Sequence, residues 1–288
     1  MTSLVNILVQ GVLLGGLYAL FAAGLSLVFG IMRLVNLAHG DLMVLAAFLI
    51  LALVTKLGLN PFVAALVAAP IMFALGWLLQ SQVLNRTLGP DILPPLLVTF
   101  GLSIVIQNGL LEVFSADSRR ISTGSLETAS LALGPVDIGV MSLLTFLSAV
   151  LVIVGLNQLF YRTALGRAFR ATSDDPAVAQ LMGLDNRHIF ALGMALSLAV
   201  VAIAGVLLAI RTNFDPAIGP ARLIFGFEAV IIGGLGSLWG TLAGGIVLGV
   251  AQGIGAQLDP GWQVLAGHLA FLVVLAVRPE GLFPKVRG

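Results

Sequence analysis

The chain has 288 residues, of which 59% are hydrophobic and 9% are charged, with a mean hydropathy of +1.10 and a net charge of +1. Soluble domains carry roughly 25% charged residues, so this composition excludes a soluble globule and predicts an integral membrane protein. The near-neutral charge argues against a nucleic-acid-binding face, and the lack of Cys excludes disulfides and thiolate metal sites.

Apolar runs near the roughly 20 residues that cross a bilayer recur from one end of the chain to the other. They lie at residues 4–31, 42–54, 61–79, 96–113, 140–160, 189–210, 224–258 and 262–277. The second run reaches spanning length only if residues 35–41 belong to the same helix. The run at 224–258 is long enough for two segments that fold back at about Gly233 to Gly240. The N-terminus lacks a basic region and a cleavage site, so we interpret it as a first span.

These runs predict an all-α polytopic membrane protein with about eight or nine transmembrane helical segments in a single transmembrane domain, residues 1–288. Two polar connections interrupt the runs, at residues 112–139 and 161–188. The first holds Ser, Thr, Gly and acids with little periodicity, which is typical of a loop on an aqueous side.

The second polar connection, 161–188, contains a predicted short helix. The segment TSDDP (172–176) places a polar cap before a proline suited to the first helical turn, and Gly183 ends the helix. The predicted helix, from Pro176 to Met182, carries an apolar strip made of Val178, Leu181 and Met182. Because acids and arginines surround this strip, it cannot reach a lipid core, and we expect it to bind a protein partner.

The positions of Lys and Arg predict the orientation, because basic residues are retained on the cytoplasmic side. If 161–188 lies inside, so do nine of the 14 basic residues: Arg33, Arg86, Arg162, Arg167, Arg170, Arg187, Arg278, Lys285 and Arg287. The loop 112–139 is then external, the N-terminus external and the C-terminus cytoplasmic. Such ends require an odd number of crossings.

Glycines within 224–258 recur every four residues in two adjoining stripes, Gly236, Gly240 and Gly244 in one and Gly245, Gly249 and Gly253 in the other. Small residues let helix backbones approach closely in lipid, so helix packing is one interpretation. The other is that the segment IGGLGS, with Gly233, Gly234 and Gly236, breaks the helix and lines a pathway. Irregular backbone at membrane depth survives only where protein or water satisfies it.

Polar residues within the apolar runs are further candidates for a translocation path, because each is costly unless solvated or paired. They are Asn36, His39, Gln107, Asn108 and Glu228. Each has a structural alternative: Asn36 or His39 caps a helix, Gln107 and Asn108 join helices, and Glu228 is hydrated near the external surface. His268, a lone polar residue in the last run, is more typical of an interhelical hydrogen-bond partner.

Three blocks carry a resemblance: GLSLVFGIMRLVNLAHGDLMVLAAF (24–48), GRAFRATSDDPAVAQLMGLD (166–185) and EAVIIGGLGSLWGTLAGGIVLG (228–249). In their order and spacing they resemble the hallmark blocks of the LivH-type permeases. These permeases are transmembrane subunits of branched-chain amino-acid ABC importers. The resemblance covers nearly the whole chain.

The resemblance implies a heteromeric importer of the bacterial inner membrane that moves branched-chain or related amino acids by ATP-driven alternating access. The implied partners are a LivM-like second permease, two ABC ATPase subunits, a periplasmic substrate-binding protein and membrane lipid. The chain has no G-x-x-x-x-G-K-[ST] motif, so we expect it to bind no cofactor, with ATP and Mg held by the ATPase subunits. We expect no metal site and no nucleic-acid partner.

The middle block corresponds to the family's coupling helix, which implies that the connection 161–188 docks on an ATPase. The implied docking residues are Arg167, Arg170, Asp174, Asp175, Pro176, Ala177, Ala179, Leu181, Met182 and Gly183. Helix capping explains the two acids at least as well, and cytoplasmic retention or contact with lipid headgroups explains the arginines.

Other functions compete with this one. A permease for urea, short amides or aromatic acids fits the same pattern, since the binding protein largely selects the substrate. An ion-coupled secondary transporter normally carries paired buried acids or histidines and often inverted repeats, and the two halves show no convincing repeat. An intramembrane enzyme needs a nucleophile with a base or a metal set, whereas His39, His188 and His268 are widely dispersed.

Overall fold

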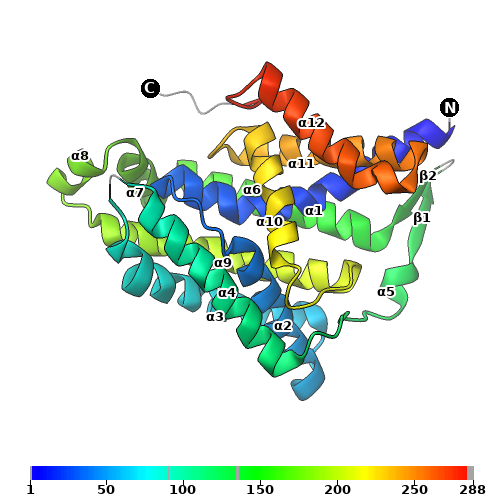
Figure 1. Cartoon of the computed structure of the whole chain (residues 1–288), viewed down its shortest axis with the longest axis horizontal. Helices are drawn as coiled ribbons and strands as arrows, with labels where there is room; N and C mark the ends of the chain where they lie inside the picture. The colour runs from blue at the N-terminus through cyan, green and yellow to red at the C-terminus, as the bar shows by residue number, and fades with distance from the viewer. Residues whose placement is uncertain (1, 90, 134–135, 284–288) are drawn as a thin grey trace. The chain divides into compact units, whose positions relative to one another are not determined.

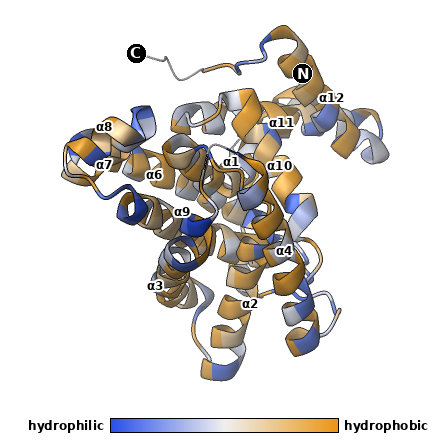
Figure 2. Cartoon of the chain, turned by 60° about the vertical axis from the view of Figure 1, so that its left-hand side comes forward, coloured by the Kyte–Doolittle hydropathy of each residue, from blue (hydrophilic) through white to orange (hydrophobic). Residues whose placement is uncertain are grey.

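The computed structural model describes residues 2–89, 91–133 and 136–283, and helices dominate these ranges (Figure 1). Within them, eight helical stretches are long and apolar enough to cross a membrane: Leu4–Met32, His39–Leu57, Pro61–Arg86, Leu93–Phe114, Val140–Arg162, Asn186–Arg211, Leu238–Leu258 and Pro260–Val277. Figure 2 shows hydrophobic residues predominating along these stretches. The chain is an all-α polytopic membrane protein, as the sequence predicts.

The elements follow one another with short connections. They are α1 (Thr2–Met32), α2 (His39–Leu57), α3 (Pro61–Leu78), η1 (Leu79–Val83), η2 (Leu84–Arg86), α4 (Leu93–Phe114), α5 (Ser125–Thr128), β1 (Ser130–Leu133), β2 (Val136–Gly139), α6 (Val140–Arg162), α7 (Ala164–Asp174), α8 (Pro176–Leu181), α9 (Asn186–Arg211), α10 (Gly219–Gly233), α11 (Leu238–Leu258), η3 (Pro260–Trp262) and α12 (Gln263–Val277). Lys285 and Arg287, used above for the orientation, lie outside the described residues.

The fold-back predicted at about Gly233 to Gly240 lies between the end of α10 and the start of α11. With 15 residues, α10 is only about 22 Å long at 1.5 Å per residue, and it is not among the eight stretches of spanning length. The predicted range of eight or nine segments therefore corresponds to eight long helices and one half-length helix in the described part of the chain.

The chain forms two compact units. Unit 1 contains residues 1–26, 122–153 and 224–288, and unit 2 contains residues 27–121 and 154–223. The chain passes from one unit to the other within α1, α6 and α10, and once between Ile121 and Ser122. The two units are therefore not two halves of the sequence that a single cut would separate.

Unit 2 is built around α9, which is buried along most of its length and packs against α2 and α3. Close approach depends on residues without side chains. A Cβ atom on Gly76 of α3 would lie 2.7 Å from the carbonyl oxygen of Met194, and one on Gly205 of α9 would lie 3.1 Å from the backbone of Ala47 in α2. These glycines let the three helices pack with their backbones nearly in contact.

Unit 1 is held together by the glycine stripes as far as they lie on α11, which excludes Gly236 in the turn before the helix. Gly244 faces the backbone of Ala229 in α10, whereas Gly249 faces Gly11 and Gly15 of α1. The contact is reciprocal, because a Cβ atom on Gly11 would lie 2.7 Å from the Cα atom of Val250. The first stripe therefore packs on α10 and the second on α1, while α12 packs on α11.

The segment after the third apolar run and the connection 112–139 both contain more regular structure than the sequence predicts. Past the predicted end of the third run, the helix continues as a π-helical turn (η1) and a 3₁₀ turn (η2) up to Arg86. The connection 112–139 holds α5 and an antiparallel hairpin in which Ser130 pairs with Gly139 (Figure 1). These elements were not predicted, because four-residue strands are too short to show periodicity in the sequence. That the connection 112–139 lies on the external side stays a prediction.

Replacing Gly249 with Ala should destabilise the protein, because the added Cβ atom would overlap the carbonyl oxygen of Gly11 and force α1 and α11 apart. Overpacking of this kind costs about 1–3 kcal/mol. We expect a lower melting temperature for the detergent-solubilised protein, followed by Trp fluorescence.

Gly253→Ala in the same stripe is the matched control, because its Cβ atom would meet its nearest neighbour, Ile7, at an ordinary 3.4 Å. Its melting temperature should stay the same or rise slightly, since Ala is the better helix former. Equal melting temperatures for the two variants would contradict the packing role of the second stripe.

Candidate functional site

The connection 161–188 ends in a short, capped helix, α8. It begins at Pro176, as predicted, and the Asp175 carboxylate accepts hydrogen bonds from the N–H groups of Ala177 (2.9 Å) and Val178 (3.0 Å). Gly183 follows with a φ of 87°, and the N–H of Leu184 reaches back to the carbonyl of Ala179 at 3.0 Å. Both ends of α8 are therefore closed by local hydrogen bonds.

The predicted apolar strip of α8 is exposed. Val178 is 53% exposed, Leu181 87% and Met182 79%. Ala177 is also exposed, whereas Ala179 is buried, and α8 contacts both α7 and α9. Of the predicted docking residues on α8, a partner can therefore reach all but Ala179, which lies on the buried face of the helix.

A second helix in this connection, α7, was missed by the sequence reasoning. Thr163 caps it by accepting from the N–H of Gly166 at 3.0 Å. Gly166, Phe169 and Thr172 form its buried face, and Phe169 stacks on Phe160 of α6 with ring centres 5.3 Å apart. The three-residue spacing of the buried positions is the signal that could have identified this helix.

The charged residues of the docking prediction have different environments. Arg167 is exposed, and Asp174 is exposed at the end of α7, not at the start of α8. Arg170 donates to the carbonyl of Phe160 and lies over the Tyr161 ring, 5.1 Å from its centre. Arg170 therefore binds the end of α6, while Arg167 and Asp174 face outward.

A polar cluster lies at the start of α2 and the middle of α4 in unit 2. Asp41 is fully buried, and its Oδ2 atom accepts a 2.5 Å hydrogen bond from the Ser103 hydroxyl. Gln107, one turn further along α4, donates to the Ser103 oxygen at 3.0 Å. Ser103 is at the midpoint of a spanning helix. A carboxylate and two polar groups therefore meet deep in the apolar part of unit 2, which we name the α2–α4 cluster.

The same face of α4 supports the break between α1 and α2. The hydroxyl of Thr99 accepts from the N–H of Leu37 at 3.2 Å, and the side-chain Oδ1 atom of Asn36 accepts from the N–H of Ala38 at 3.0 Å. Both Thr99 and Asn36 are fully buried, and His39 is nearly so. Asn36 therefore stabilises the turn before α2 but does not cap the helix, whose N-cap residue is Ala38 without a side-chain cap.

The half-length helix α10 begins beside Asp41 of the α2–α4 cluster. A Cβ atom on Gly219, its first residue, would overlap the Asp41 carboxylate, and one on Gly40 would overlap the carbonyl of Gly219. Before it, Phe214 is fully buried and packs on Phe48 with ring centres 5.0 Å apart. The connection from α9 thus turns back among the helices of unit 2, and such irregular backbone is characteristic of transport sites.

A second cluster lies in unit 1. Glu228 of α10 is 4% exposed, so it is not a hydrated surface group, and its Oε1 atom is 2.5 Å from the Nδ1 atom of His268 in α12. Phe225 stacks between the rings of His268 (5.9 Å) and Tyr18 (5.1 Å), and Tyr18 donates to Gln252 at 2.5 Å. His268 is therefore an interhelical partner, as predicted, and its partner is Glu228.

The glycines between α10 and α11 form a tight turn. Gly234 and Gly236 have positive φ values, and Ser237 caps α11 by accepting from the N–H of Gly240 at 3.1 Å. The N–H groups of Leu282 and Phe283 donate to the last carbonyls of α10. These contacts account for the glycines by backbone geometry, and a role of Gly233, Gly234 and Gly236 in lining a path stays a prediction.

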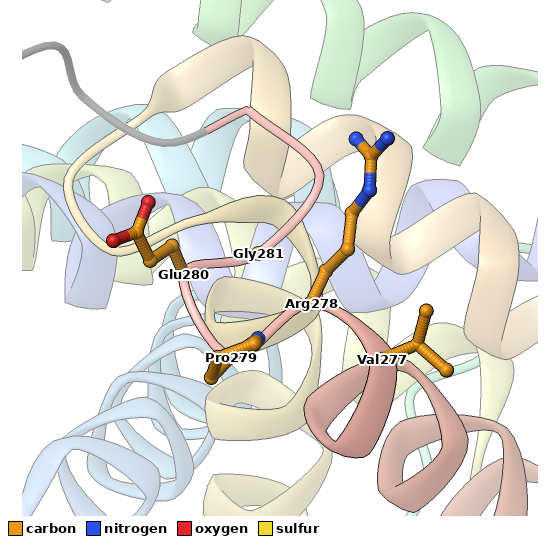
Figure 3. Close-up of a pocket in the computed structure, with 5 residues that line it drawn as sticks. All are labelled: Val277, Arg278, Pro279, Glu280 and Gly281. Atoms are coloured by element: carbon orange, nitrogen blue, oxygen red, sulfur yellow. The ribbon is translucent and has the colours of Figure 1, made fainter.

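Figure 3 shows a surface hollow at the end of α12, lined by Val277, Arg278, Pro279, Glu280 and Gly281. The side chains of Arg278 and Glu280 are exposed and point in different directions. The hollow brings no buried polar group to its surface, so it is a feature of the turn after α12 and not a candidate site.

The structure brings some predicted path residues together and separates others. Gln107 joins the α2–α4 cluster, whereas Asn108 is exposed and donates to the carbonyl of Ile104 in its own helix at 2.8 Å. The sequence reasoning missed Thr99 and Ser103 as members of the site. Thr99, Ser103 and Gln107 follow one another at intervals of four residues, which places all three on one face of a helix, and that was the available signal.

Comparison with known proteins identifies the family of this chain. Residues 7–277 match the family described as "Branched-chain amino acid transport system / permease component". The chain belongs to this permease family. The permease is 33% identical to the high-affinity branched-chain amino acid transport system permease protein BraD of Pseudomonas aeruginosa, over 96% of this chain and 95% of that protein.

Two further relatives come from Escherichia coli strain K12. The permease is 29% identical to the permease protein LivH over 96% of this chain and 94% of LivH. It is 27% identical to the permease protein LivM, over 94% of this chain and 68% of LivM. Together these matches make the permease a LivH-type member of the family, as the three sequence blocks indicated.

Replacing Ser103 with Ala should destabilise the permease, because the buried Asp41 carboxylate loses its hydroxyl donor. Leaving such a group unsatisfied costs about 1–3 kcal/mol, and we expect a correspondingly lower melting temperature in detergent. Asn108→Ala on the exposed side of α4 is the control and should change stability by less than about 0.5 kcal/mol. If both variants melt alike, Asp41 does not depend on Ser103.

Proposed function

We propose that this permease is the LivH-like subunit of an ATP-driven importer of branched-chain or related amino acids, located in the bacterial inner membrane. A LivM-like second permease would share the translocation path, two ATPase subunits would drive it, and a periplasmic protein would deliver the substrate. The observation that carries this proposal is the exposed apolar strip of α8, on a capped helix between two spanning helices.

The docking role follows from the physics of α8. An exposed strip of Val178, Leu181 and Met182 on a charged connection is unfavourable in water and cannot enter lipid. A groove on a protein partner would cover it, as amphipathic helices are covered in helix-in-groove complexes. Since the chain has no nucleotide-binding motif, ATP and Mg would bind on that partner, and the permease itself would need no cofactor.

Transport would proceed by alternating access. Closure of the ATPase pair around ATP would move α8, which contacts α9, and α9 is the central helix of unit 2. Movement of α9 would displace residues next to the α2–α4 cluster, because Met194 of α9 contacts Asn36, just before α2, with its sulfur 3.9 Å from the Asn36 amide nitrogen. We expect the translocation path for a zwitterionic substrate to pass the α2–α4 cluster and the start of α10, which lies against Asp41.

The orientation is part of the proposal: N-terminus external, α8 and C-terminus cytoplasmic. It requires an odd number of crossings. Eight spanning helices supply eight, and the returning connection 212–218 together with the half-length α10 would complete a ninth. The excess of basic residues on the side of α8 supports the same orientation.

One observation favours a different class of function. Asp41 and Glu228 are both buried in an apolar protein, and buried acids are also what an ion-coupled secondary transporter uses. Reconstitution separates the two functions. The permease in proteoliposomes with its partner permease, ATPases and binding protein should take up amino acid only with ATP, and uptake by the lone permease under a proton or sodium gradient would contradict the importer. Offering urea, short amides and aromatic acids in the same assay identifies the substrate class.

Replacing Leu181 with Asp should weaken ATPase binding, because the largest exposed apolar contact of α8 becomes a charge. We expect the amount of ATPase that co-purifies with the permease, and ATP-driven uptake, to fall at least about tenfold. Ala177→Arg, on the same exposed side, should uncouple ATP hydrolysis from uptake.

Gln180→Ala on the same helix is the matched control, since Gln180 is exposed but polar. It should leave co-purification and uptake near the wild-type level. Normal ATPase binding by Leu181→Asp, with normal membrane insertion of all variants, would remove α8 from its docking role.

A further inference from the structure

The extension of α3 contains an unusual turn that the proposed function leaves unexplained. Residues Leu79–Val83 form a π-helical turn, followed by the 3₁₀ turn Leu84–Arg86. A π-helical turn is rare and frequently occurs at functional sites. This one packs against α9, the helix that follows α8 in the chain.

The π turn buries an amide. Gln80 has no exposed surface, and its Nε2 atom donates to the Oδ1 atom of Asn85 at 3.0 Å. The Oε1 atom of Gln80 has no hydrogen-bond partner among the described residues. An apolar side chain would avoid this unsatisfied acceptor, so the amide is not explained by stability alone.

Asn85 continues the hydrogen bonds to the next helix. Its Nδ2 atom donates to the carbonyl oxygen of Arg187, in the first turn of α9, at 3.1 Å. The preceding residue, Asn186, is 5% exposed and donates from its Nδ2 atom to the carbonyl of Pro176 at 2.7 Å. Pro176 is the first residue of α8. One hydrogen-bonded connection therefore runs from the start of α8, through the start of α9, into the π turn of α3.

The end of α7, in the middle of the connection 161–188, is attached differently. The hydroxyl of Ser173 in α7 donates to the carbonyl of Gly30 in α1 at 2.7 Å. The bond from Ser173 leads to a regular helix, whereas the bonds through Asn186 and Asn85 lead to the π turn. The route by way of Asn85 therefore ends at a helical turn that can change its hydrogen bonding, because a π turn and an α turn differ by one residue in register.

We propose that Gln80 and Asn85 are positioning residues that couple the movement of α8 to α3, with the π turn as the element that changes. The proposal rests on the proposed docking of α8 on an ATPase. When α8 moves, Asn186 and Arg187 move with it, and Asn85 transmits the displacement to the turn that holds Gln80. Neither side chain needs to touch the substrate or the ATPase.

The test uses the complete importer, with partner permease, ATPases and binding protein in proteoliposomes, and measures ATP hydrolysis and uptake in the same vesicles. Asn85→Asp keeps the acceptor for Gln80 and removes the donor to Arg187. Gln80→Leu replaces the buried amide with an apolar side chain of similar size. Both should assemble and hydrolyse ATP within about twofold of wild type, while uptake per ATP falls about fivefold or more.

Ser81→Ala is the control in the same turn, because the Ser81 hydroxyl is exposed and its described hydrogen bond goes to the carbonyl of Leu78. It should keep wild-type uptake per ATP. The inference is overturned if Asn85→Asp and Gln80→Leu transport as efficiently as wild type, or if their loss of uptake only parallels a loss of assembled complex or of melting temperature. Failure of the docking proposal would look different, since wild-type permease itself would then not bind the ATPases.

Discussion

The scarcity of water in the interior of a membrane protein is the constraint on which this structure depends. Every break in a helix leaves backbone N–H and C=O groups that must find partners within the protein. At the break between α1 and α2, Thr99 and Asn36 supply those partners. One turn further along the same face of α4, Ser103 donates to Asp41. One face of α4 therefore both supports the backbone at the helix break and contributes to the polar site in unit 2.

Glycine determines how closely the helices of this chain pack. Where α11 meets α1 and α10, and where Gly40 meets Gly219, backbones approach too closely for any side chain. Such contacts provide the packing that holds helices together in lipid. Lipid tails are as apolar as the side chains, so the hydrophobic effect does not drive helices to associate there.

Much of this architecture could be predicted from the sequence because the signals are local. The spanning helices follow from the length of apolar runs, and α8 follows from Asp175, Pro176 and Gly183, whose capping chemistry acts within one turn. The resemblance of three blocks predicted the family. The π turn could not be predicted, because it depends on contact with α9, a helix that lies far along the chain.

The polar clusters were only partly predictable for a related reason. Gln107 was identified as a polar residue in an apolar run. Ser103 and Thr99 are small and common in membrane helices, so their spacing was a weak signal, and their contacts with Asp41 and Leu37 were needed to show their role. Glu228 and His268 were each identified alone, and their pairing required the fold. Single residues can be read from a sequence, whereas long-range pairs require the packing of helices.

The tail after α12 has a mechanical consequence. A helix normally ends with carbonyl groups that its own next residues or water must cap. In α10, the carbonyls of Ile232 and Gly233 are instead capped by Leu282 and Phe283, from a segment continuous with α12. The ends of α10 and α12 therefore share one joint, and Glu228 and His268 join the same two helices within their length. Because the two helices are joined at two levels, we expect them to move together if either is displaced.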